Sequence, residues 1–349
     1  MIDKTTKKSP DFSSELEFPF PNLPTPGKTI ELAPEIRWLR MPLPFALDHI
    51  NLWLIKDNNG WAAIDTGISS DKTRDLWDKI LLNELDGYPI TKMVVTHYHP
   101  DHLGNASWLM DKFNIPLFMT LTEYLTAHAQ HSGTAGNDQS KQLFASHGLD
   151  KNLLNSMTAG GSAYKKIVPN LPNNMVRMIN GDLISIGSNQ WRVIVGYGHS
   201  PEHASLHCES LGIIISGDML LPKISTNVSV WPIDPLGNPL KAFLSSINEF
   251  KKLPEKTLIL PSHGIPFIGA HARVKMLYAH HNDRLEETVS ACDTPITAYE
   301  LLPIMFKRKL DSHQIFFAMG EAIAHLNYLW HAKELSRITR NDQQIRFKN

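Results

Sequence analysis

The sequence has little cysteine: only Cys208 and Cys292 in 349 residues. Two cysteines cannot build the disulfide framework of a small secreted protein, and their scarcity is typical of chains that fold in a reducing compartment. The first 28 residues contain early lysines but no apolar core of the length found in signal peptides. We therefore expect a cytoplasmic protein.

Long hydrophobic runs and an excess of charge of one sign are also absent. The longest apolar stretches, such as residues 211–216, have the length of a buried strand and not of a membrane span. The 34 lysine and arginine residues balance 35 aspartate and glutamate residues, which gives a formal net charge of -1. This balance gives no support to a nucleic-acid partner, although a local basic patch would fit within it. We expect a small-molecule substrate and no membrane.

The order of apolar patterns along the chain predicts a layered α/β core. Strand patterns dominate from about residue 29, and residues 120–168 indicate a helical insertion. Strand patterns then resume, and after Gly269 the pattern is helical almost throughout. We therefore expect an N-terminal arm (1–28), a core domain (29–269) that contains the insertion, and a helical C-terminal domain (270–349).

Histidine is abundant, with 17 residues, and the densest group follows the predicted strand 92–96 in the segment THYHPDH. Side chains two positions apart at a strand end project to the same side, so His97 and His99 can bind one ion together. After the turn, Asp101 and His102 face a second position. Imidazole and carboxylate ligands suit zinc and related first-row ions. A chance cluster is a much weaker explanation, at odds of about one in several hundred.

Three further residues, His199, Asp218 and His263, each follow the end of a predicted strand. Taken alone, each would be a weak signal, because a single histidine or aspartate in a loop is more often a cap or a solvated residue. Their shared position just past a strand predicts that they converge with the first motif into a metal site held by rigid elements.

This order of residues resembles the hydrolases of the metallo-β-lactamase superfamily, which carry an HxHxDH motif, a lone histidine, a bridging aspartate and a final histidine. The resemblance covers about residues 29–269 and implies a four-layer αβ/βα sandwich with the metals at one edge. It implies that the first metal is bound by His97, His99 and His199, the second by Asp101, His102 and His263, and both by Asp218. It also places Asp65, in the segment IDTG, where hydrogen bonds would orient the ligands. The alternative for Asp65 is a simple turn aspartate.

The expected cofactors are two divalent metal ions, in the first place Zn²⁺, with iron or manganese as alternatives that accept the same ligands. Two cations that share a water lower its pKa toward neutrality, so a metal-bridging hydroxide would attack the substrate. Asp101 could accept the proton and pass it to the leaving group.

Spacing narrows the kind of hydrolase. His263 follows Asp218 by only 45 positions, which leaves no room for the large inserted domain of the RNA- and DNA-processing branch. True zinc β-lactamases use cysteine where this chain has Asp218. The resemblance is then to thioesterases of the glyoxalase II kind, lactonases and proteins like human lactamase-B-like protein 2, whose winged-helix-type C-terminal domain the tail resembles.

A thioester or an ester/lactone is the first expectation for the substrate, because the helical insertion could cap a pocket for an acyl chain. Its apolar residues are Leu121, Leu125, Leu143, Phe144, Leu153 and Met157. The alternative is that most of these residues pack the insertion onto the sandwich.

Two other functions remain open. One is a single-strand-specific endoribonuclease, since some members of the tailed group cut RNA. The other is a DNA-binding regulatory module that uses the C-terminal domain, for which the short basic cluster Lys307-Arg308-Lys309 is thin support. A homodimer through the tail is a further hypothesis.

Four histidines outside the motifs receive no role. Alternation along a strand accounts for His203 and His207. His280 and His281 could reach the pocket, but a solvated helix face is the favoured interpretation.

Overall fold

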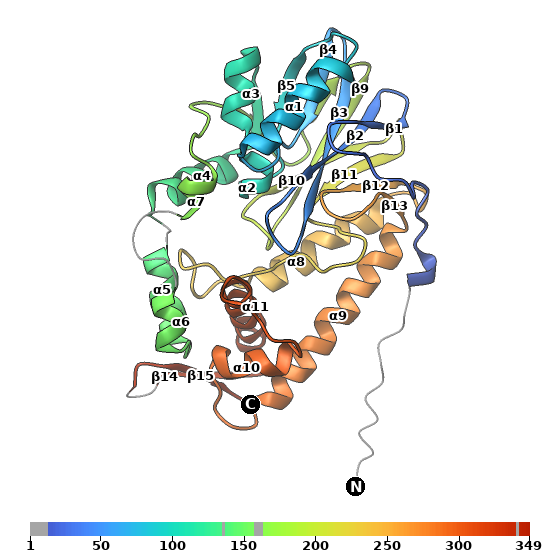
Figure 1. The fold of residues 1–349 in the computed structure, drawn as a ribbon. Helices are drawn as coiled ribbons and strands as arrows, with labels where there is room; N and C mark the ends of the chain where they lie inside the picture. The colour runs from blue at the N-terminus through green and yellow to red at the C-terminus, as the bar shows by residue number, and fades with distance from the viewer. Residues whose placement is uncertain (1–12, 135–136, 157–162, 340–341) are drawn as a thin grey trace.

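The computed structural model describes residues 13–134, 137–156, 163–339 and 342–349. Its centre is a pair of β-sheets packed face to face, with helices on both outer sides (Figure 1). The first sheet has the strand order β1-β2-β3-β4-β5-β6-β7, and the second has the order β13-β12-β11-β10-β9-β8. The predicted αβ/βα sandwich is therefore confirmed.

The elements have the following bounds. The first sheet contains β1 (Ile30–Ala33), β2 (Ile36–Pro42), β3 (His49–Asp57), β4 (Gly60–Ile64), β5 (Ile90–Val94), β6 (Leu117–Thr120) and β7 (Val176–Met178). The second contains β8 (Leu183–Ile186), β9 (Asn189–Gly196), β10 (His203–Cys208), β11 (Ile213–Gly217), β12 (Leu258–Pro261) and β13 (Phe267–Ile268). The helices of the sandwich are η1 (Ser13–Glu15), α1 (Asp71–Asn83), α2 (Pro100–Leu103), α3 (Ala106–Phe113), α8 (Pro239–Ile247) and η2 (Asn248–Lys252). The insertion contains α4 (Leu121–Ser132), α5 (Asn137–Ser146), α6 (Lys151–Ser156) and α7 (Ala163–Ile167). The C-terminal part contains α9 (Ala270–Ala291), α10 (Ala298–Met305), α11 (Ser312–His331), β14 (Ser336–Thr339) and β15 (Ile345–Lys348).

Apolar side chains join the layers. Trp38 and Trp191 belong to the cluster between the two sheets. Trp77 of α1 and Leu109 of α3 belong to a cluster on the outer face of the first sheet, and Phe243 of α8 belongs to one on the outer face of the second. Burial of each such side chain contributes about 1.5–3 kcal/mol, so these clusters hold the sandwich together.

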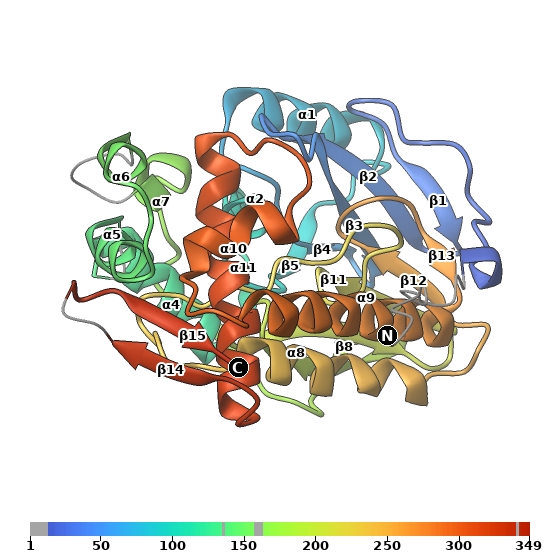
Figure 2. The same cartoon turned by 90° about the horizontal axis from the view of Figure 1, so that it is seen from below.

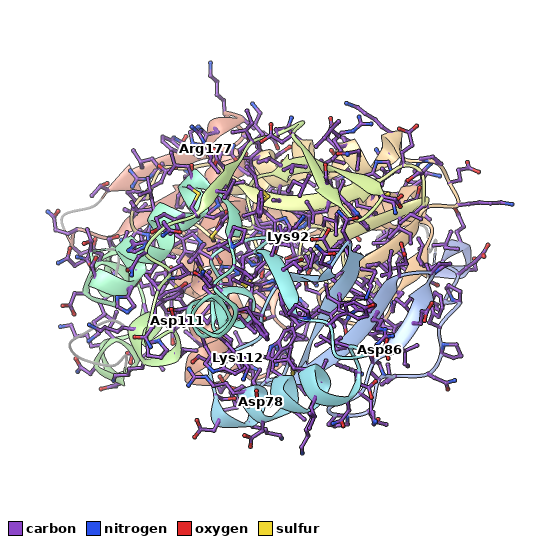
Figure 3. The ribbon with its side chains drawn as sticks, turned by 90° about the horizontal axis from the view of Figure 1, so that it is seen from above. Asp78, Asp86, Lys92, Asp111, Lys112 and Arg177 are labelled. Atoms are coloured by element: carbon purple, nitrogen blue, oxygen red, sulfur yellow. The ribbon has the colours of Figure 1, made fainter. Side chains whose placement is uncertain are left out.

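Surface charges contribute much less to the cohesion of the layers. Lys112 of α3 and Asp78 of α1 form an exposed ion pair with an N···O distance of 2.8 Å, and both lie on the outside of the molecule (Figure 3). An exposed pair of this kind contributes about 0–1 kcal/mol. The packing of α3 beside α1 therefore depends on their apolar faces.

Parallel pairing determines which residues share an edge. Strands β4 and β5 run parallel in the first sheet, and β11 and β12 run parallel in the second. The residues that follow these four strands are Asp65, His97, Asp218 and His263. Because the carboxyl ends of parallel strands lie at one edge, the topology gathers these four side chains there. Figures 1 and 2 show α9, α10 and α11 on the same side of the sandwich as α2.

The last helical pattern, predicted over residues 312–336, ends five residues earlier in the structure. Helix α11 ends at His331, and Lys333 adopts a left-handed backbone with a φ of 63°, which a helix cannot continue. Strands β14 and β15 then pair antiparallel. Ile345 and Phe347 are buried on one face of β15, which is the period of a strand and not of a helix.

The predicted insertion is helical, as expected, but it reaches the C-terminal part as well as the sandwich. Leu143 and Phe144 of α5 are buried in the cluster that includes α10 and α11, and the rings of Phe144 and Phe316 are 5.4 Å apart. The interpretation that these two residues serve packing is therefore favoured over a lining of a substrate pocket. Leu125 is exposed, and Met157 lies outside the described residues. Within the described residues, no helix combines the length and the apolar character that a membrane crossing requires.

Candidate metal centre

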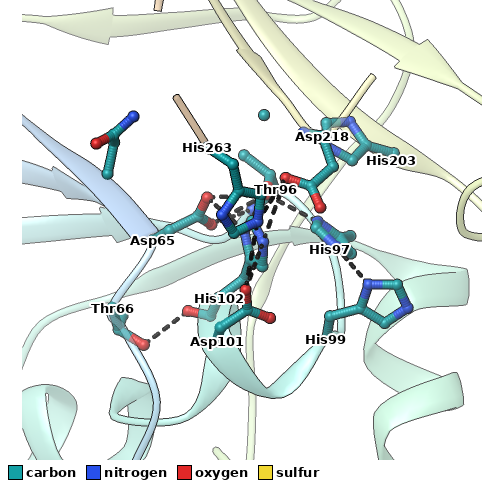
Figure 4. Close-up of polar contacts among 12 residues, drawn as sticks. Asp65, Thr66, Thr96, His97, His99, Asp101, His102, His203, Asp218 and His263 are labelled. Carbon is teal, nitrogen blue, oxygen red and sulfur yellow. Dashed lines mark hydrogen bonds and ion pairs between the residues drawn. The ribbon is translucent and has the colours of Figure 1, made fainter. Parts of the chain in front are cut away.

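The seven candidate ligands lie together at the edge of the sandwich, and Figure 4 shows most of them. His97 and His99 lie on the loop after β5, and Asp101 and His102 lie in the first turn of α2. Pro100 begins this helix, where its fixed φ is compatible with a first turn and its missing N–H costs nothing. The turn at Pro100 directs His97 and His99 toward one candidate metal position, and Asp101 and His102 toward a neighbouring one.

The first group consists of three histidines and one aspartate. Nε2 of His97 lies 2.8 Å from Nδ1 of His99 and 3.2 Å from Nε2 of His199. Oδ2 of Asp218 lies 3.4 Å from Nε2 of His199. Ligand atoms of these four residues all lie within 4.8 Å of one another. One position is therefore surrounded by three imidazole nitrogens and a carboxylate oxygen.

The second group consists of Asp101, His102 and His263. Oδ2 of Asp101 lies 3.5 Å from Nε2 of His263 and 3.7 Å from Nε2 of His102. Oδ1 of Asp218 lies 3.4 Å from Nε2 of His263 and 3.6 Å from Nε2 of His102. One oxygen of Asp218 thus faces each group, so this carboxylate lies between the two positions.

In His199 and His263, the ring nitrogen that faces away from the other candidate ligands, Nδ1, donates a hydrogen bond to a backbone carbonyl. This bond determines the protonation of the other ring nitrogen, Nε2. Nδ1 of His199 lies 2.8 Å from the carbonyl oxygen of Asn227, and Nδ1 of His263 lies 2.8 Å from the carbonyl oxygen of His49. A carbonyl oxygen only accepts, so each Nδ1 carries the proton. Each Nε2 then presents a lone pair to the centre, which is the form of histidine that ligates metals.

Asp65 contacts the motif directly and is fully buried. Its Oδ2 lies 2.8 Å from Nδ1 of His102, and its Oδ1 accepts the backbone N–H of Thr96 at 2.8 Å. The first bond orients the ring of His102, and the second fixes the loop just before His97. Asp65 itself has a φ of 60°, a left-handed backbone that costs free energy and brings its carboxylate to both partners.

The pKa values of the buried side chains differ between the two groups. Burial and the neighbouring histidines hold the pKa of His97 well below its usual value. Burial also lowers the pKa of His102, but the carboxylates of Asp65, Asp101 and Asp218 outweigh this effect and raise it to about 10. The pKa of Asp218 is well below its usual value, because His263 and His102 outweigh its burial.

The donor set fits divalent metal ions. Nε2 of His102 and Oδ1 of Asp218 are buried and lack a hydrogen-bond partner among the described residues, a costly arrangement that a cation between them would relieve. Tetrahedral zinc with Zn–N bonds of about 2.0–2.1 Å places two ligand nitrogens about 3.3 Å apart. The 3.2 Å between His97 and His199 matches this spacing. Imidazole and carboxylate donors suit zinc, iron and manganese alike.

Two residues beside the candidate ligands, His203 and Glu123, were given no role in the site by the sequence analysis. His203 is buried at the start of β10, and its Nε2 accepts the backbone N–H of Asp218 at 3.0 Å. Its position four residues after His199 was a possible signal. Glu123, in the first turn of α4, accepts hydrogen bonds from the loops that carry His97 and His199. Nothing in the local sequence indicates these distant partners.

The solvated helix face predicted for His280 and His281 is wrong for His281. This residue is buried on α9, with its Nδ1 3.3 Å from Nε2 of His325 on α11. His280 is half-buried. The ring of His281 therefore lies where α9 packs against α11.

Comparisons with known proteins match most of the chain to proteins of one superfamily. A family model described as "Metallo-beta-lactamase superfamily" matches residues 46–263, and one described as "Metallo-beta-lactamase-like, C-terminal domain" matches residues 285–349. The structure resembles a beta-lactamase domain protein from Burkholderia ambifaria, with a TM-score of 0.91, 46% identity and coverage of 97% of this chain and 99% of that one. It also resembles a metallo-beta-lactamase family protein from Thermus thermophilus, with a TM-score of 0.78, 27% identity and coverage of 91% and 100%. The probable metallo-hydrolase YqjP of Bacillus subtilis (strain 168) is 25% identical over 83% of this chain and 91% of its own length.

Proposed function

The chain belongs to the metallo-β-lactamase superfamily, and from this premise we propose that it is a dinuclear metal-dependent hydrolase that acts on a thioester or an ester/lactone of a small molecule. The observation that carries the proposal is the position of Asp218, with one oxygen facing each of two groups of candidate ligands. A shared carboxylate between two three-ligand groups is what a pair of adjacent cations requires.

The residues divide between the two ions as their distances suggest. The first ion would be held by His97, His99 and His199, the second by Asp101, His102 and His263, and both by Asp218. When bound, two divalent cations, in the first place Zn²⁺, supply Lewis acidity and lower the pKa of a shared water toward neutrality.

The side chains of this site then orient the reactants and move one proton. Asp101 is about one-fifth exposed, more than His102, His263 or Asp218, so it can meet an entering substrate. Its carboxylate would accept the proton of the attacking water and return it to the leaving oxygen or sulfur. His199 and His263 direct their Nδ1 protons to carbonyl oxygens, and their Nε2 atoms would be held by the ions, so neither ring would compete for that proton.

An acyl substrate is supported by two exposed apolar side chains that lie close to His199, or to its contact Thr226, in the sequence. Tyr197, two residues before His199, is 46% exposed. Ile224, two residues before Thr226, which contacts Nδ1 of His199, is 48% exposed. Large apolar side chains left exposed near a reactive centre are typical of a binding surface for an apolar group. The short connection from Asp218 to His263 also favours a small substrate over RNA.

The proposal is tested by measuring turnover of the metal-loaded protein on acyl-thioesters, esters, lactones, phosphodiesters and single-stranded RNA, each with and without a chelator. We expect chelator-sensitive hydrolysis of a thioester, an ester or a lactone. Cleavage of RNA alone would favour the endoribonuclease function, and activity that survives complete metal removal would contradict the metal-dependent mechanism.

A further inference from the structure

Glu123 joins the two loops that carry the histidines of the first group. It is fully buried in the first turn of α4. One carboxylate oxygen, Oε2, accepts the backbone N–H of Tyr98 at 2.9 Å. The other, Oε1, accepts the hydroxyl of Ser200 at 2.6 Å and the backbone N–H of Glu202 at 2.7 Å. A single side chain thus spans segments that are about 100 residues apart in the sequence.

These contacts are adjacent to the candidate ligands. Tyr98 lies between His97 and His99, and Ser200 directly follows His199. The two loops meet where Nε2 of His97 lies 3.2 Å from Nε2 of His199. The carboxylate therefore ties the backbone of one loop to the backbone of the other, one residue from each of the three rings.

The insertion holds the backbone of Tyr98 on both sides of its Cα atom. Its N–H donates to Glu123 of α4, and its carbonyl oxygen accepts the hydroxyl of Tyr164 of α7. Both bonds are buried, so water does not compete for them. The loop between His97 and His99 consequently depends on two helices of the insertion.

Local helix chemistry makes this arrangement unexpected. Thr120 and Glu123 stand at the N-cap and N3 positions of α4, where a threonine and a glutamate normally form a capping box. Thr297 and Glu300 form that box at the start of α10. At α4 the Thr120 hydroxyl instead donates to the carbonyl oxygen of Glu202 at 2.9 Å. Both side chains therefore contact the loop after His199 and leave their own helix uncapped.

The loop compensates the helix in return. The carboxylate of Glu202 accepts the backbone N–H of Thr122, at 3.3 Å, which is one of the free donors of the first turn of α4. Loop and helix thus exchange hydrogen bonds in both directions. Burial raises the pKa of Glu123, and the bonds from Ser200, Glu202 and Tyr98 oppose this rise.

We propose that Glu123 is a positioning residue for the first metal ion, which sets the separation of His97 and His99 from His199 and so makes affinity at that position depend on the insertion. The inference rests on the proposed function, since it assumes that the first group binds an ion. Residues that orient metal ligands in this way typically change metal affinity by about 10–100-fold when they are altered.

The test is a titration of metal-free protein with Zn²⁺, in which stoichiometry and affinity are measured together with thermal unfolding. Glu123→Gln keeps the size of the side chain but replaces one of its two accepting oxygens with a donor. We expect wild-type protein to bind two ions tightly, and Glu123→Gln to bind one of them at least about tenfold more weakly. Glu300→Gln, the same change at the N3 position of α10, is the matched control and should bind both ions as wild type does.

A second background identifies the weakened position. His263→Ala removes a ligand of the second group only, so the tight ion that remains in this variant occupies the first group. Adding Glu123→Gln to His263→Ala should weaken that remaining ion. If Glu123→Gln does not fold, Tyr164→Phe releases the same loop from the other side and should weaken the first ion selectively, by several-fold.

The outcomes separate the inference from the proposed function. Two tight ions in Glu123→Gln, or in Tyr164→Phe where only that variant folds, would overturn the positioning role. Equal weakening of both ions, matched by Glu300→Gln at equal loss of thermal stability, would also overturn it. Absence of tight metal binding in wild-type protein would contradict the proposed function itself.

Discussion

At the scale of single residues, the geometry of the centre depends on groups that never face the ions. Asp65, Asn227 and the carbonyl of His49 each hold the outer nitrogen of a candidate ligand. His203 acts one bond further away, through the backbone N–H of Asp218. Such partners fix ring orientation before a metal arrives, which lowers the cost of assembling the site.

The contact of His203 gives a prediction at this scale. His203→Leu removes the acceptor for the backbone N–H of Asp218 and leaves that donor buried, so we expect the free energy of unfolding to fall by about 1–3 kcal/mol. We also expect weaker binding of both ions, because Asp218 lies between them. Denaturant unfolding and metal titration measure the two effects.

His207→Leu is the control, since His207 lies on the same strand and makes no contact with the candidate ligands in the part of the chain that the structure describes. Unchanged metal affinity in His203→Leu would show that the position of Asp218 does not depend on this bond.

The candidate ligands could be predicted from the sequence because they occur in short motifs at strand ends. His97, His99, Asp101 and His102 fall within six residues, and their spacing alone indicates chelation. Glu123 could not be found in this way. Its partners Tyr98 and Ser200 lie 25 and 77 residues away, and its local signature indicates a helix cap instead.

At the scale of elements, alternation and apolar runs located most strands, because β4, β5, β11 and β12 are buried and rich in β-branched or other apolar residues. The hairpin of β14 and β15 was missed. Its strands are four residues long, and each carries a partly buried arginine, Arg337 or Arg346, among its apolar residues, so their pattern is weak. Phe347 is buried against the helices of the C-terminal part, a contact that the sequence pattern alone does not indicate.

Contacts between elements also predict a pH dependence of stability. His147, at the end of α5, is buried and stacks on Phe347 of β15 with ring centroids 6.1 Å apart. Burial lowers the pKa of His147 to about 3. Since an unfolded histidine titrates near 6.5, the unfolded state gains the proton first as pH falls, and the folded state loses stability from about pH 6.5 downward.

His147→Phe should remove this contribution while it keeps the stacked ring. We expect similar stability of wild type and variant near pH 7.5, and at pH 5 a relative gain for the variant of at most about 2 kcal/mol. Thermal unfolding at several pH values measures it. A constant difference between the two proteins across this range would mean that His147 does not titrate as proposed.

At the scale of the whole molecule, the loop of residues 226–230 connects the C-terminal part to the candidate metal centre. The carbonyl oxygen of Asn227 holds His199, and Ser229 donates to the side chain of Asn227 at 2.7 Å. Next in the chain, Val230 donates its N–H to the carbonyl oxygen of Gly320 on α11 at 3.1 Å. A Cβ on Gly320 would lie 2.6 Å from the Ser229 hydroxyl, so glycine allows this close approach.

The sandwich and its edge could be predicted from the sequence, but the contacts between distant parts could not. Which face of α11 meets the loop 226–230, and which helices of the insertion reach the loop at Tyr98, follow from packing of the complete chain. Both contacts end within three residues of a candidate ligand or of the carbonyl group that holds one. The insertion and the C-terminal part therefore support the site, whichever substrate it accepts.

The measurement that tests the central claim most directly is the number of metal ions bound per chain, by elemental analysis of wild-type protein and of Asp218→Ala. Asp111→Ala, which changes an exposed aspartate on α3, is the control. The account predicts two ions for wild type and for Asp111→Ala, and loss of metal together with turnover for Asp218→Ala. Two ions and full turnover in Asp218→Ala would contradict it.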